Sequence, residues 1–235
     1  MGHCSRIAGS IRLQRRVKNT GQAGQANRAR HPVEKWVTQA EGEGRLAAKW
    51  RRDVRELPDR TFRIVWRDIA QPTDTRSLIC SVVPRGSFVG NTLNICEVIE
   101  AGEAAVEPAL VSGINAVLSS MSADFYVRQR MAKHVNAFIL KELPLPREPE
   151  VVRQLGELAL PLYLGEDFEA FRGDVEPLED EVKRLKLIAK LDARVAHLYG
   201  FTYEEYQAVL NTFPLVDPEQ KARCLRAYND WTFDL

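Results

Sequence analysis

Five side chains that can donate hydrogen bonds to anions or bases fall close together in one stretch of the chain. Arg128, Arg130, Lys133 and His134 lie within seven residues, and Asn136 follows them. Arg and Lys donate readily to phosphate oxygens, while Arg matches the exposed edge of guanine and Asn that of adenine. The types and spacing therefore suit contact with a nucleic acid, provided that the fold presents them together.

The segments on either side indicate how these residues are positioned. Apolar residues recur at intervals of three and four before the cluster, at Leu110, Ile114, Val117, Leu118, Met121 and Phe125. This spacing predicts one long helix with a wide apolar face, and that helix should be buried. The apolar run Ala137 to Leu140 follows the cluster, and Leu143-Pro-Leu-Pro146 then predicts an extended exit, because a residue before proline disfavours helix.

The order of these features resembles the target-recognition region of adenine-specific DNA methyltransferases. These enzymes belong to type II restriction-modification systems and related phage-defence systems. The resemblance begins with Ala116 to Ser120, Asp124-Phe125, Arg128, Asn136 and Leu143 to Pro146, with Ser119 where the family usually has Asn. It extends over about 60 to 215, through the segments Trp66 to Ala70, Thr73 to Ser77, Gly90 to Leu93, Lys190 to Ala193, His197 to Phe201 and Leu210 to Pro214.

The resemblance implies that the chain recognises a specific double-stranded DNA sequence on behalf of a methyltransferase catalytic domain or subunit. In the intact enzyme that domain would bind S-adenosylmethionine, flip out the adenine, and lie N-terminal to this region. Such enzymes hold the base with an Asn/Asp-Pro-Pro-aromatic motif, and no two of the 12 prolines here are adjacent. We therefore expect a C-terminal fragment without a catalytic residue or cofactor site of its own.

Ten residues are candidates for contacting DNA, because their side chains can donate to base edges or phosphates. Some have an alternative role within the fold: Arg67 could pair with Asp68 or Asp74, Arg76 could cap a turn, and Asn136 could bond to the backbone. The ten candidates are Arg63, Arg67, Arg76, Arg85, Asn91, Asn94, Arg128, Arg130, Lys133 and Asn136.

Composition excludes several other classes of protein. Residues 1–31 carry a charge of +7, which leaves −6 for the rest of a chain whose net charge is +1, so any DNA contact must come from a local patch. No apolar stretch is long enough to span a membrane. The four cysteines and four histidines are dispersed, so neither a metal site nor a disulfide framework is predicted, and the thiols suit a reducing cytoplasm. Asp174, Glu181 and Lys183 mimic a nuclease centre, but solvated surface charge explains them better.

The predicted fold class is α+β, with a small strand-containing recognition unit followed by a helical C-terminal unit. Strands are expected at 61–69, 77–83 and 88–99. We divide the chain into a disordered basic leader at 1–31, a target-recognition region at 32–150, a linker at 151–177 and helices at 178–235. Asp217-Pro218 should open the last helix, Thr202 with Glu205 should cap a short one, and Gly200 should end the long one before it.

Other interpretations remain open at this point. The late helices could dock a partner protein without any DNA role, or the chain could be a remnant that no longer folds. The leader could be a phosphate-binding arm, a transit peptide, or a non-native extension. DNA recognition predicts binding that weakens as the salt concentration rises, whereas a protein-interaction module predicts none.

Overall fold

The computed structural model describes residues 11–13, 61–85, 87, 89, 92–100, 103–104 and 107–230, and these form an α+β fold, as predicted. The strands are β1 (Ile11–Leu13), β2 (Arg63–Arg67), β3 (Cys80–Val83), β4 (Leu93–Glu100) and β5 (Glu103–Ala104). The helices are α3 (Pro108–Ser119), α4 (Met121–Arg128), α5 (Ala137–Glu142), α6 (Pro149–Ala159), α7 (Glu169–Arg172), α8 (Glu181–Leu198), α9 (Tyr203–Asn211) and α10 (Pro218–Asn229). Within these ranges, no helix combines the length and apolarity needed to cross a bilayer.

The sheet is antiparallel, and β2 lies at its centre between β3 and β4. Alternation in the sequence predicts one buried face for β2, but Ile64 and Val65 are both buried, so the strand is covered on both sides. Three residues of the predicted leader form β1 and pair with β4, so the expectation of disorder does not apply to them. The rest of that leader, and residues 32–60 of the predicted target-recognition region, lie outside the described residues.

The single long helix predicted from Ala109 onward is two helices, α3 and α4, separated at Ser120. Ser120 has an extended backbone, and its hydroxyl accepts a hydrogen bond from the N–H of Ala123 at 3.0 Å, which caps α4. The Asp192 carboxylate accepts from the next free N–H, that of Met121, at 3.1 Å. The backbone groups freed by the break are thus satisfied by side chains, one of them 71 residues away.

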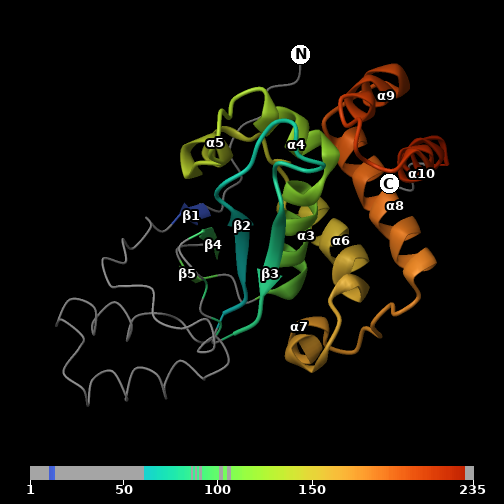
Figure 1. Cartoon of the computed structure of the whole chain (residues 1–235). Coiled ribbons are helices and arrows are strands. Elements are labelled where there is room, and N and C mark those ends of the chain that lie inside the picture. Colours follow the sequence, from blue (N-terminus) through green and yellow to red (C-terminus); the bar gives the residue numbers. More distant parts are fainter. Residues whose placement is uncertain are drawn as a thin grey trace.

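Residues 151–177 are not a linker, because they contain most of α6, all of α7 and two short 3₁₀ turns. Figure 1 shows α3 between the sheet and α6. The two helices touch backbone to backbone: a Cβ added at Gly156 would lie 1.7 Å from the Ala109 carbonyl oxygen, and one at Gly113 would lie 1.9 Å from that of Val152. Glycine at these two positions permits the close approach. Helix α6 therefore packs closely on α3 and belongs to the strand-containing unit.

The predicted ends of the C-terminal helices are confirmed. Gly200, just after α8, has a φ of 74°, which suits a glycine that ends a helix. Thr202 and Glu205 form the complete capping box of α9, and the Asp217 side chain accepts from the Glu219 N–H at the start of α10. These helices share an apolar core that includes Tyr206, Phe213 and Cys224.

Candidate nucleic-acid interface

The buried carboxylate of Asp124, on α4, connects the β2–β3 loop to the helices. It is 0% exposed and accepts from Arg76 Nε at 2.7 Å and from Arg128 Nε at 3.3 Å. It also accepts from the backbone N–H groups of Ser77 and Leu78, at 3.0 and 3.1 Å. These bonds hold 77–78 against α4, and β3 accordingly begins at Cys80, later than the sequence predicts. We refer to Asp124, Arg76 and Arg128 as the Asp124 network.

The two arginines of the network also bind backbone carbonyls. Arg76 donates from Nη2 to the carbonyls of Ser119 and Ser120, at 2.7 and 2.9 Å, and so serves the end of α3. Arg128 donates from Nη2 to the carbonyls of Asp74 and Thr75, at 2.7 and 3.1 Å, within the β2–β3 loop. The Arg128 guanidinium also lies over the ring of Phe213, 4.1 Å from its centroid. Phe213, in the turn between α9 and α10, therefore packs against an arginine that holds the loop.

A third arginine closes the same loop on its outer side. Arg67 pairs with Asp74 at 2.7 Å, which is one of the two partners expected from the sequence. Asp74 also accepts from the Gln71 N–H at 3.1 Å, and Ser77 Oγ donates to the Gln71 carbonyl at 2.7 Å. Residues 71–77 thus form a compact loop whose conformation is fixed by its own bonds and by three arginines.

The β2–β3 loop and the α4–α5 loop lie side by side. Ile69 pairs with His134 as an isolated antiparallel bridge. The Ala70 N–H donates to the Lys133 carbonyl at 3.2 Å, and Trp66 Nε1 donates to that of Val135 at 2.8 Å. Figure 1 shows the β2–β3 loop reaching α4, with α5 next to it. Two segments more than 60 residues apart in sequence therefore present one continuous surface.

That surface is rich in exposed polar side chains. We define the loop surface as the exposed polar residues of the two loops: Gln71, Thr73, Thr75, Gln129, Arg130, Lys133 and Asn136. Arg130 is anchored by its guanidinium, which lies 3.7 Å from the centroid of the Tyr126 ring. Asn136 precedes α5, and its side chain does not cap that helix. Amide, hydroxyl and cationic donors of these kinds can contact base edges and phosphates.

The ten predicted residues fall into distinct groups in the structure. Arg130, Lys133 and Asn136 are exposed residues of the loop surface, whereas Arg67, Arg76 and Arg128 are less exposed and bind carboxylate and carbonyl groups of the fold. Asn94 donates to Asp68 at 3.3 Å, next to the loops. Asn91 lies outside the described residues.

Arg63 and Arg85 lie at the opposite end of the sheet from the loop surface. Arg63 pairs with Val83 at the start of β2, whereas the β2–β3 loop follows the end of that strand, roughly 15–20 Å away at 3.3 Å per residue. Arg63 is buried and donates to the Ser87 carbonyl. Arg85 lies over the ring of Phe62, which packs on Phe171 of α7. The fold does not bring these two residues to the other candidates.

Sequence reasoning missed four residues of the loop surface, Gln71, Thr73, Thr75 and Gln129, because uncharged polar residues in a turn carry no distinctive signal. It also missed the role of Asp124. The spacing of Asp124 and Arg128 by four residues in a helix was a usable signal for that pair. The partner Arg76 lies 48 residues upstream, so its role could not be read from local spacing.

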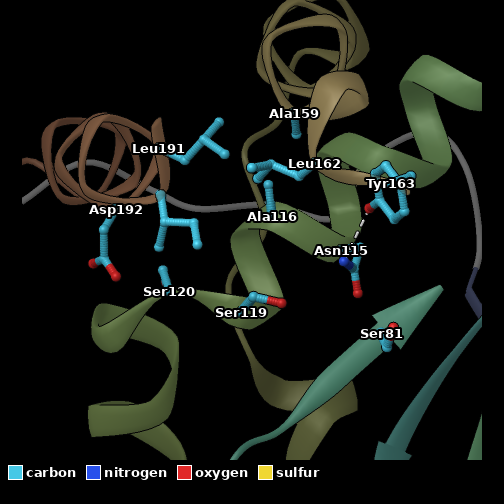
Figure 2. A pocket seen from close by; sticks show the side chains of 11 residues that line it. Ser81, Asn115, Ala116, Ser119, Ser120, Ala159, Leu162, Tyr163, Leu191 and Asp192 are labelled. Carbon is cyan, nitrogen blue, oxygen red and sulfur yellow. Dashed lines mark hydrogen bonds between the residues drawn. The ribbon is translucent and has the colours of Figure 1, made fainter. Parts of the chain in front are cut away.

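A second feature is a hollow of about 260 Å³ between α3, α8 and β3, shown in Figure 2. Asn115 donates to the Tyr163 hydroxyl at 3.0 Å, while its buried Oδ1 has no hydrogen-bond partner among the described residues. Burial raises the pKa of Tyr163, and it raises the pKa of Asp192, which also lines the hollow, to about 6. The volume is below the range of about 300–1,000 Å³ typical of ligand pockets.

Comparison of the chain with protein-family models, with curated proteins and with solved structures found no match.

Proposed function

We propose that the chain recognises a specific sequence of double-stranded DNA through the loop surface, and that it does so for an adenine-specific methyltransferase of a restriction-modification or phage-defence system. The methyltransferase chemistry, with S-adenosylmethionine, belongs to a catalytic domain or subunit that acts with this region. The observation that carries the proposal is the joining of two distant loops into one exposed polar surface, next to arginines whose guanidiniums bind carboxylate and carbonyl groups of the fold.

The basic residues have two different roles, within the fold and at its surface, and this difference supports the proposal. Arg67, Arg76 and Arg128 donate to carboxylates and carbonyls and so fix the loop backbone. The exposed residues of the loop surface are then held on a preorganised scaffold, which lowers the entropy lost when a ligand binds. Arg130 and Lys133 supply charge for phosphates, while Gln71 and Asn136 carry amides that match adenine.

The test is selection of bound fragments from a pool of random-sequence duplex DNA by the full-length chain, at two salt concentrations. We expect an enriched motif together with affinity that falls as salt rises. Because residues 1–31 are also basic, salt-sensitive binding without a motif would indicate phosphate contact alone and would contradict sequence recognition. Absence of binding by a folded sample would contradict the proposal altogether.

A second candidate function is protein docking by the C-terminal helices. Apolar side chains are exposed there, with Val182 at 55% and Leu215 at 62%. A partner that covers them would gain apolar burial. This function predicts no salt-dependent binding to DNA. It also predicts that substituting both residues with serine abolishes the capture of a protein partner, whereas substitutions on the loop surface leave that capture unchanged.

A further inference from the structure

Phe138 is an exposed aromatic residue beside the loop surface. It is the second residue of α5 and is 61% exposed. An exposed large apolar side chain next to polar, cationic neighbours is a common mark of a binding surface.

The outward direction of Phe138 is fixed by its neighbours in α5. Ile139 and Leu140, which follow it, are 2% and 7% exposed and pack in the main core. Successive residues in a helix point about 100° apart, so Phe138 cannot join them in the core without unwinding the helix. The Tyr126 hydroxyl also donates to the Glu142 carbonyl at 2.8 Å, which ties the far end of α5 to α4.

The charge around Phe138 points to a polyanion as its partner. Asn136 lies two residues before it, and the exposed cations Arg130 and Lys133 lie in the preceding loop. Arg130 is held on Tyr126, the same residue that fixes the end of α5. Another exposed apolar residue, Ile69 at 46%, pairs with His134 within this surface. An apolar protein partner would have to strip water from these cations, whereas duplex DNA pairs them with phosphates.

We infer that Phe138 reads DNA by packing against the 5-methyl group of a thymine in the major groove. This inference rests on the proposed function. The thymine methyl is the apolar group that base pairs present in the major groove, and Phe is among the side chains that contact it. The same groove displays the adenine edge that the neighbouring Asn136 amide can bind, so one face of the protein serves both contacts.

The test uses the duplex enriched by selection with the full-length chain, resynthesised with deoxyuridine in place of thymine at each position in turn. Uracil pairs normally but lacks the methyl group. We expect one substitution to weaken wild-type binding about fourfold, the effect of one buried methyl-sized group. The same substitution should not weaken binding by Phe138→Ala any further. Leu164→Ala is the matched control, since Leu164 is an exposed apolar residue outside the loop surface, 39% exposed, and it should keep the wild-type response.

The outcomes separate this inference from the proposed function. If the wild-type chain enriches no motif, the proposed function itself fails. If it enriches a motif but Phe138→Ala binds as tightly as wild type, or keeps its full response to uracil, the thymine contact is refuted while DNA recognition stands. If sedimentation shows that Phe138→Ala converts a dimer into a monomer, the residue serves contact between copies of the chain, and the inference is also refuted.

Discussion

The strand-containing unit and the C-terminal helices use charged residues in opposite ways. Around the β2–β3 loop, Asp124 is 0% exposed, the Arg128 side chain is 7% exposed, and their bonds determine the backbone. In α10, Arg223 and Arg226 meet Glu219 at the surface, where the Glu219 side chain is 53% exposed. Exposed pairs contribute little to stability, whereas breaking a buried one is costly. Arginines near a candidate interface can therefore be structural. The exposed donors beside them are the better candidates for contact.

Removing the buried carboxylate of Asp124 should have the largest effect on stability and tests this comparison. Asp124→Ala would leave the Arg76 and Arg128 guanidiniums and two backbone N–H groups without their acceptor. We expect the free energy of unfolding to fall by about 3–5 kcal/mol, measured by urea titration. The control Glu219→Ala removes two exposed ion pairs and should cost less than about 1 kcal/mol. Equal effects of the two substitutions would show that the Asp124 network is not structural.

A substitution at the contact between α3 and α6 tests whether α6, which lies mostly in the predicted linker 151–177, packs closely against the strand-containing unit. Gly156→Ala would place a Cβ 1.7 Å from the Ala109 carbonyl oxygen, and a backbone atom cannot move aside cheaply. We expect a loss of about 2–3 kcal/mol, the upper part of the usual range for overpacking. Gln154→Ala, on an exposed position of the same helix, should change stability by less than about 0.5 kcal/mol. A neutral Gly156→Ala would argue that the two helices are not packed this closely.

Asp192 provides a pH test of the junction between the two regions. Burial raises its pKa from 3.8 to about 6, so the folded chain holds a proton that the unfolded chain has released between these values. Stability contributed by this group is therefore present at low pH and is lost as the pH rises through about 6. Asp192→Asn carries no such proton. Its stability relative to wild type should rise by about 2–3 kcal/mol between pH 4 and pH 7 and then stay constant. A difference that does not change with pH would contradict the raised pKa.

The sequence predicted those parts of the fold that depend on residues close together in the chain. The ends of α8, α9 and α10 follow from Gly200, Thr202 with Glu205, and Asp217, all of which act within a few residues. The break at Ser120 could not be predicted, because Asp192 and Arg76, which satisfy the freed backbone groups, are far away in sequence. Helix α6 was missed because its two close glycine contacts are tertiary, although Val152, Leu155 and Ala159 carry a helical spacing.

The candidate site shows the same limit. Residue type placed Arg130, Lys133 and Asn136 correctly at one exposed surface, because they follow a buried helix directly. Residue type could not distinguish them from Arg76 and Arg128, whose acceptors are set by the packing of the β2–β3 loop on α4. The exposure of Phe138 likewise depends on which side of α5 faces the core.

DNA recognition through the loop surface is tested most directly by comparing two pairs of exposed cations in the full-length chain. Arg130→Gln with Lys133→Gln removes charge from the loop surface, while Lys186→Gln with Lys190→Gln removes the same charge from the exposed side of α8. Affinity for the enriched duplex is measured against salt concentration. We predict that the first pair weakens binding and lowers the slope of log affinity against log salt by about two, and that the second pair leaves the slope unchanged. Equal losses from both pairs would contradict recognition through the loop surface.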